Sequence, residues 1–283
     1  MAMLARARST SLDDLRNRAE WIRLRTIDLV EIAGSGHYTS VFSCAELFAA
    51  LYYHALRLDP LVPGNPDRDR FLLGKGHAAI GLYPCLADLG YFPKEWLDSY
   101  TRLGSALGDH PDMRKVPGID FSSGSIGHNL SVGVGMAYAG RLQRRDYRTV
   151  VMLGDAELNE GQIWEAAMAA SHYRLGNLVA IVDLNTMGLD GLVEDIMAVE
   201  PVAEKFEAFG WRTHEFDGHD MVQVLDALDH LPAVDSLQPT CLLARTAKGR
   251  GVPFMEGSPD WHLGFLGPQD KQRAVNSIRE RLQ

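Results

Sequence analysis

The sequence predicts an α/β protein in which a parallel sheet carries helices on both faces. In the second half of the chain, short apolar runs rich in β-branched residues alternate with segments whose apolar residues have helical spacing. Alternating β and α units imply parallel strands, because each crossover helix returns the chain to the same end of the sheet. No convincing boundary or internal repeat interrupts the 283 residues, so we expect a single domain over residues 1–283.

The first half of the chain is predicted to be mainly helical. Ser11 is a suitable N-cap for a helix over residues 11–32, and Asp13 and Asp14 favour its first turn. Gly34 then breaks this helix. Beyond it, we expect helices over residues 43–56, from about residue 77, over 94–104 and over 130–143, with a strand over 70–74 and a loop over 109–129.

The second half repeats a strand followed by a helix. The segment "TVVMLG" is typical of a strand buried on both faces, and several apolar residues after Gly161 share one side of a helix. The same pattern predicts strands over 150–154, 178–184, 212–216 and 240–246, and helices over 163–173, 202–210, 221–231 and 276–283.

Composition narrows the classes of partner. The formal net charge of −9 argues against nucleic acid or an anionic membrane as the main partner, and no apolar run reaches membrane-spanning length. The three cysteines are far apart in apolar stretches, which predicts reduced core residues of a cytoplasmic protein. Residues 1–10 are basic, but they are too short and too weakly apolar for a secretory signal.

Polar side chains follow two of the predicted strands. Asp155 comes after the strand over 150–154, and Asn185 follows the next strand roughly thirty residues later, the length of one βαβ step. Neighbouring parallel strands would bring both to one edge of the sheet, where α/β proteins bind ligands. Carboxylate and amide oxygens suit Mg²⁺ or Ca²⁺, with phosphate oxygens completing the shell. In the alternative, Asp155 caps a helix and Asn185 makes a turn.

Several motifs carry a resemblance to one family. "GDAELNEG" at Gly154 followed by "DLN" at Asp183 resembles the thiamine diphosphate motif, which runs G-D-G and then N-N or D-x-N. The chain is similar to transketolase, and above all to the amino-terminal subunit of transketolases split into two chains. This likeness rests, in order and with similar spacing, on "GSGH" at Gly34, "DRFLLGKGHA" at Asp69, "DHPD" at Asp109, "SSGSIGHNLSVGVGMA" at Ser122 and "TAKGRGVPFMEGSPDWH" at Thr246.

The resemblance implies a role for each residue at a matching position. A metal ion, Mg²⁺ or else Ca²⁺ or Mn²⁺, would be held by Asp155, Asn185 and the backbone carbonyl of Met187. Glu160 would belong to a catalytic carboxylate network that crosses the subunit interface, and Glu157 would be a solvated charge. Thiamine diphosphate would contact His77, Gly124, Ser125, Ile126, Gly154, Ala156, Asn185 and His262. His37, His110 and His262 would be the catalytic histidines of the substrate channel.

Histidines suit the chemistry that the family implies. Transferring a two-carbon ketol unit from a ketose to an aldose, with or without phosphate, moves protons on hydroxyl groups, and imidazoles titrate near neutral pH. The other histidines are expected to have no role: His128 in the matched turn, and His54, His172, His214, His219 and His230 outside the motifs.

Three residues depart from the family pattern. Ala156 replaces a glycine, which costs little if φ is negative there. Tyr38 and Asn129 also replace the usual residues, and we expect them to narrow or recolour the pocket.

The resemblance also implies partners. In this family a second domain binds the aminopyrimidine ring of the cofactor, and no segment here is long enough to be that domain. We therefore expect a partner, the carboxy-terminal transketolase subunit, in an assembly of two copies of each chain. Trp164, Met168 and Tyr173, on the helix after Gly161, are large residues of the kind enriched in interface cores.

Two other functions stay open at this point. One is a subunit of a different thiamine diphosphate enzyme, such as the alpha chain of a 2-oxo acid dehydrogenase or a relative of deoxyxylulose phosphate synthase. The other is a non-catalytic regulatory subunit of the same fold. The "GSGH" and "DWH" segments favour transketolase.

Overall fold

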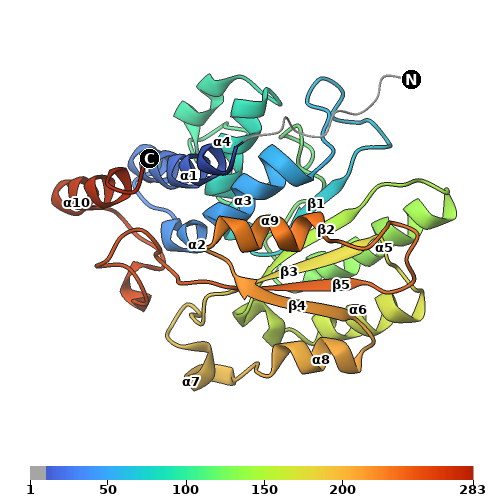
Figure 1. Ribbon diagram of the computed structural model, residues 1–283. Coiled ribbons are helices and arrows are strands. Elements are labelled where there is room, and N and C mark those ends of the chain that lie inside the picture. The colour runs from blue at the N-terminus through green and yellow to red at the C-terminus, as the bar shows by residue number, and fades with distance from the viewer. Residues whose placement is uncertain (1–10, 283) are drawn as a thin grey trace.

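A five-stranded sheet lies at the centre of the computed structural model, which describes residues 11–282 (Figure 1). All strand pairings are parallel, in the order β1-β2-β3-β5-β4. The predicted fold class is therefore confirmed. The strands are β1 (Arg70–Leu73), β2 (Thr149–Gly154), β3 (Leu178–Leu184), β4 (Arg212–Asp217) and β5 (Thr240–Arg245).

Helices cover both faces of the sheet, and each face has its own apolar core (Figure 1). Successive strand residues point to opposite faces. Val150 and Met152 of β2 therefore enter one core, while Val151 and Leu153 enter the other. The first core packs against α1 (Leu12–Ala33), α3 (Ala45–Ala50), α4 (Ala79–Leu89) and α9 (Met221–Asp229). The second packs against α5 (His128–Leu142), α6 (Gly161–His172) and α8 (Val202–Ala208).

The first helix begins and ends as the sequence predicts. The hydroxyl of Ser11 accepts the backbone N–H of Asp14, whose carboxylate accepts the N–H of Ser11 in return. Gly34 ends α1 with a left-handed φ of 77°. The buried guanidinium of Arg23 joins this helix to α3, because it pairs with Glu46 at 2.6 Å.

Other segments differ from the prediction. The helix expected over 43–56 is divided into α3 and a π-helix, η1 (Leu51–Ala55), and a short helix α2 (Tyr38–Phe42) precedes it. The helix expected over 94–104 is only a 3₁₀ segment, η3 (Lys94–Ser99). The last helix, α10 (Pro268–Arg279), begins earlier than residue 276, because Pro268 is favoured in a first helical turn. The remaining short helices are η2 (Gly76–Ala78), η4 (Ala156–Asn159), α7 (Val193–Met197) and η5 (Pro259–Trp261).

The described residues also bear on the compositional arguments. Cys44, Cys85 and Cys241 are buried and unpaired, as predicted. Among residues 11–282, no helix is both long and apolar enough to cross a membrane. The basic segment 1–10 lies outside the described residues.

Candidate functional site

A cleft lies at the carboxyl ends of β2 and β3, where Gly154 is in register with Asp183. Its volume is about 210 Å³. Many of the residues predicted to bind cofactor or metal line it, although they come from widely separated segments. The lining residues are Ser40, Lys75, His77, Ile126, Gly154, Asp155, Ala156, Glu157, Asn185, Met187, Gly188, Leu189, Lys248 and His262.

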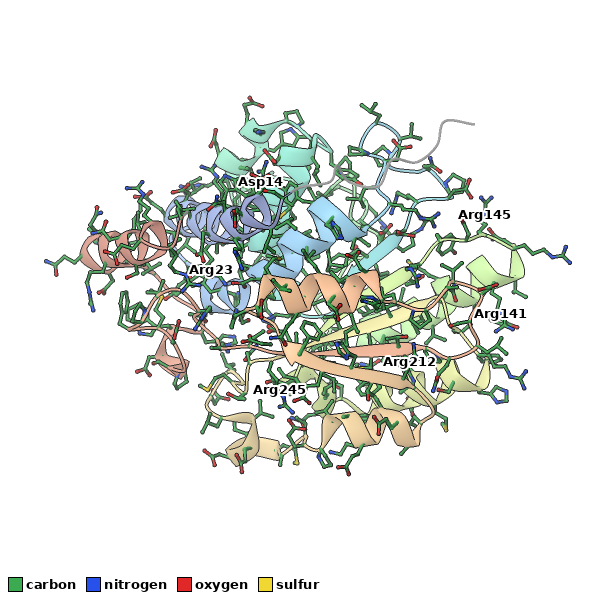
Figure 2. All side chains as sticks on the ribbon, viewed as in Figure 1. Asp14, Arg23, Arg141, Arg145, Arg212 and Arg245 are labelled. Carbon is green, nitrogen blue, oxygen red and sulfur yellow. The ribbon has the colours of Figure 1, made fainter. Side chains whose placement is uncertain are left out.

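A larger cavity of about 410 Å³ lies at the opposite ends of the strands, next to Asp146 and Asn177. It contains none of the predicted site residues. Figure 2 shows two of its arginines, Arg141 and Arg145, far from Arg245, which ends β5. We place the functional site in the smaller cleft, because the chemically capable side chains converge there.

Asp155 is the most constrained carboxylate of the cleft. It is buried, and its two oxygens accept the backbone N–H groups of Ala156 at 2.8 Å and Thr186 at 2.5 Å. Burial, and then repulsion from Asp183, raise the pKa of Asp155 to about 6. A cation at this point would relieve both effects.

The loop after β3 is shaped around Asp155. Thr186 has a φ of 66°, which is rare for a β-branched residue and costs about 1–3 kcal/mol. This conformation lies between Asn185 and Met187, at the residue whose N–H meets Asp155. Backbone strain of this kind concentrates at binding and catalytic sites.

Asn185 is oriented by a buried ion pair. Its side-chain N–H donates to Asp183 at 3.1 Å, and Asp183 also pairs with Lys75. Burial alone would raise the pKa of Asp183, but Lys75 outweighs burial and lowers it. Ser43 and Thr246 donate to the same carboxylate. Asp183 therefore stays ionised and fixes the side-chain amide of Asn185.

Lys248 lies on the carbonyl groups that follow Asn185. Its ammonium group donates to the carbonyl of Gly188 at 2.8 Å, and the carbonyl of Met187 lies 3.4 Å away. It also donates to Nδ1 of His262 at 2.5 Å. Burial, and then the nearby Lys75, lower the pKa of Lys248 to about 8. The sequence reasoning assigned no role to Lys248, although it lies within the quoted "TAKGRG" segment.

These groups fit a hard divalent cation. Asp155 supplies a carboxylate oxygen, Asn185 an amide oxygen and Met187 a backbone carbonyl that already faces an ammonium group. No three His, Cys, Asp or Glu side chains between residues 11 and 282 form a metal-binding group by themselves. A metal held here therefore needs further oxygens from a ligand, as Mg²⁺ bound to a diphosphate does.

Four histidine rings meet above the cleft. The ring centroid of His37 lies 5.1 Å from His77, 5.4 Å from His262 and 6.4 Å from His110. An antiparallel bridge between Gly36 and Gly264 brings the first and last motifs of the chain together.

Burial keeps two of these imidazoles neutral. It lowers the pKa of His77 well below its usual value, with Lys75 adding to the effect. Burial, and then Lys248, lower the pKa of His262 to about 4. Neutral imidazoles can accept protons and hydrogen bonds from a hydroxyl-bearing substrate.

Asp109 lies between His37 and His110. Its two oxygens are 3.5 Å from Nδ1 of His37 and 3.4 Å from Nδ1 of His110. Burial alone would raise the pKa of Asp109, but His37 outweighs it and lowers the pKa. The sequence reasoning passed over Asp109, although the quoted "DHPD" motif contains it.

The Gly-rich turn over residues 124–127 forms one wall of the cleft through Ile126. Gly124 lies beside His110, and the carbonyl of Ser125 accepts the N–H of His128. Glu160 precedes α6 and packs close to Gly127. The turn and the start of α6 are therefore neighbours, as the motif order suggested.

Glu157 is the clearest error of the sequence reasoning. It is not solvated: only 3% of it is exposed, and its carboxylate accepts backbone N–H groups from Gly127 and Gly154. Burial raises the pKa of Glu157 to about 7. The segment after Asp155 turns inward as the 3₁₀ helix η4, and this carries the side chain under the turn.

The departures from the family pattern have small effects on the cleft. Ala156 is absent from the described residues that have positive φ, so its methyl group causes no backbone strain. Tyr38 and Asn129 are both buried, and neither lines the cleft. The expectation that they narrow this pocket is therefore wrong.

His219, to which the sequence reasoning gave no role, supports the segment before Lys248. Its Nε2 accepts the backbone N–H of Ala247 at 2.8 Å, so a neutral ring carries its hydrogen on Nδ1. That nitrogen lies 3.2 Å from Glu46. His219 thus links α3 to a wall of the cleft.

Comparison with known proteins identifies the family. A family model described as "Transketolase, thiamine diphosphate binding domain" matches residues 15–282. One of the two subunits of the apulose-4-phosphate transketolase of Phocaeicola vulgatus is 38% identical, over 96% of both chains. The 6-deoxy-6-sulfo-D-fructose transketolase subunit SqwG of a Clostridium species is 41% identical, over 94% of this chain and 97% of that subunit.

Solved structures agree with the sequence comparisons. The transketolase of Campylobacter jejuni superposes with a TM-score of 0.88 at 28% sequence identity. The match covers 94% of this chain, which spans 42% of that enzyme's length. The resemblance stated from the motifs is confirmed. The chain belongs to the transketolase family and carries the thiamine diphosphate-binding domain of that family.

Proposed function

We propose that this chain is the cofactor-binding subunit of a two-chain, Mg²⁺-dependent transketolase. It transfers a two-carbon ketol unit from a ketose, or its phosphate, to an aldose. The observation that carries the proposal is the convergence of four histidines, Asp155 and Asn185 on one cleft. The relatives that are named as transketolase subunits support a chain that works with a second subunit.

The cleft residues divide between holding the cofactor and holding the substrate. Asp155, Asn185 and the carbonyl of Met187 hold Mg²⁺. Thiamine diphosphate supplies a nucleophilic carbon for the two-carbon unit when it is bound. Its diphosphate is held through the metal, with contacts from Lys248 and from the remaining cofactor-binding residues: His77, Gly124, Ser125, Ile126, Gly154, Ala156, Asn185 and His262.

The other histidines act on the substrate. His37 and His110 flank Asp109, which orients both rings toward the place where sugar hydroxyls would lie. His262 is kept neutral and so accepts a hydroxyl proton. Glu160, at the beginning of α6, extends the carboxylate network toward the partner chain. We place this activity in the cytoplasm, because the cysteines are unpaired.

The function is tested by reconstitution. The purified chain alone should show no ketol transfer, because the pyrimidine-binding half of the cofactor site lies on the partner. Mixing it with the partner subunit, thiamine diphosphate and Mg²⁺ should produce transfer, measured by chromatography with phosphorylated and unphosphorylated ketose donors. If the complex binds the cofactor but transfers no ketol unit from any ketose, the chain is not a transketolase subunit.

We further infer that two copies of this chain associate through α5 and α6. Tyr138 and Tyr173 pack together, with ring centroids 4.9 Å apart, although both are partly exposed. Leu142 and Met168 are 67% and 57% exposed. Trp164, in contrast, packs against Phe206 and Phe209 of its own chain, so it contributes little to this surface.

Replacement of Met168 by glutamate should break the assembly of two copies of each chain. A charge buried in an apolar interface is costly, so the association constant should fall at least about tenfold. Sedimentation with the partner present measures this. Leu237→Glu is the control, because Leu237 is equally exposed, at 56%, but lies elsewhere. Equal behaviour of the two variants would exclude α6 from the interface.

A further inference from the structure

The buried carboxylate of Glu157 connects two walls of the cleft. One oxygen accepts the N–H of Gly127 at 2.7 Å, and the other accepts the N–H of Gly154 at 3.1 Å. Gly127 ends the turn over 124–127, and Gly154 ends β2. A single side chain therefore joins the flexible wall of the cleft to the rigid one.

The surroundings of Glu157 are built to admit this carboxylate. A Cβ atom added to Gly74 would lie 2.6 and 2.7 Å from the two carboxylate oxygens, so only glycine fits there. Glu157 forms no ion pair among the described residues, and its hydrogen-bond partners are backbone amides. A buried carboxylate satisfied only by backbone N–H groups acts on the shape of the backbone.

The turn over 124–127 needs an external support. Gly124 and Gly127 have φ values of 147° and 80°, which glycine adopts freely, so the turn has little intrinsic preference for one shape. Besides Glu157, Gln162 of α6 holds it by donating to the carbonyl of Ile126 at 3.2 Å. Both supports come from the segment that follows Asp155.

We propose that Glu157 is a positioning residue that sets the turn over 124–127 relative to the end of β2 before the cofactor binds. This inference rests on the proposed function, since Gly124, Ser125, Ile126 and Gly154 are the groups assigned there to cofactor contacts. Glu157 itself is neither a metal ligand nor a proton donor in this scheme. Its effect passes through the backbone that it holds.

Glu157→Gln tests this with little change of shape. A glutamine can accept only one of the two N–H groups, and its own amide N–H then opposes the other. In the full chain without cofactor, hydrogen exchange over residues 122–130 should become about tenfold faster, while the rest of the chain is unchanged. Glu204→Gln is the control, because Glu204 is an exposed residue of α8.

The second measurement is cofactor affinity in the complex with the partner subunit. Titration calorimetry with thiamine diphosphate and Mg²⁺ should show about tenfold weaker binding in Glu157→Gln than in Glu204→Gln. Glu157→Asp, which keeps the charge but is too short to reach both amides, should show the same two changes and serves if Glu157→Gln does not fold.

The outcomes separate this inference from the proposed function. Unchanged exchange over 122–130 overturns the inference, as does faster exchange throughout the chain together with unchanged affinity, which indicates a merely structural carboxylate. If the wild-type complex does not bind thiamine diphosphate at all, the proposed function fails. The exchange of residues 122–130 then still decides whether Glu157 holds the turn.

Discussion

Replacement of Asp155 by alanine should abolish the Mg²⁺-dependent binding of thiamine diphosphate. The buried carboxylate is the only anionic group among the three proposed metal ligands, and a dianionic diphosphate depends on the metal to reach it. Without Asp155, the metal would have only neutral oxygens from Asn185 and Met187. Removing a charged ligand from a buried metal site leaves too little compensation for desolvating the ion.

Titration calorimetry with the partner subunit present measures this effect. The wild-type complex should bind thiamine diphosphate with Mg²⁺ and bind it poorly once the metal is chelated. Asp195→Ala is a matched control, since Asp195 is an exposed aspartate of α7 in the same region. Unchanged affinity in Asp155→Ala would refute the metal assignment, provided that circular dichroism shows the variant folded.

Replacement of His37 or His262 by alanine should lower the turnover number by roughly 10²–10⁴-fold, the usual contribution of a positioned acid or base. Both rings lie in the histidine cluster, 5.4 Å apart, and both come from loop segments rather than from the core. The fold should therefore survive either substitution. The double variant should lose less than the product of the two single losses, because neighbouring residues act together.

Steady-state kinetics of the reconstituted complex, with thermal unfolding of each variant, tests this role. His214→Ala is the control, because His214 lies on β4, where only Phe216 stacks with it among the aromatic side chains of the described residues. A loss of turnover that follows the fraction of unfolded protein would assign His37 and His262 a structural role. A normal turnover number in a folded variant would remove that histidine from the mechanism.

Periodicity alone was sufficient to predict the sheet. The segment 178–184 is predicted and observed as β3 with the same limits, because a strand buried on both faces needs an apolar run of that length. The place of Asp155 and Asn185 at one sheet edge also follows from local order, since parallel neighbours align their carboxyl ends. Motif resemblance then named the histidines, which no periodic pattern distinguishes.

Only the tertiary structure decided the electrostatic environment of these residues. Lys75 and Asp183 are separated by 108 positions, yet they form a buried pair that orients Asn185. The inward turn of η4 buries Glu157, where sequence reasoning placed a solvated charge. Local sequence determines the tendency to form a strand or a helix, but burial and charge pairing depend on which distant segments pack together. For this chain, the sequence determined the scaffold and the candidate residues, and packing determined which of them are ionised, neutral or held in place.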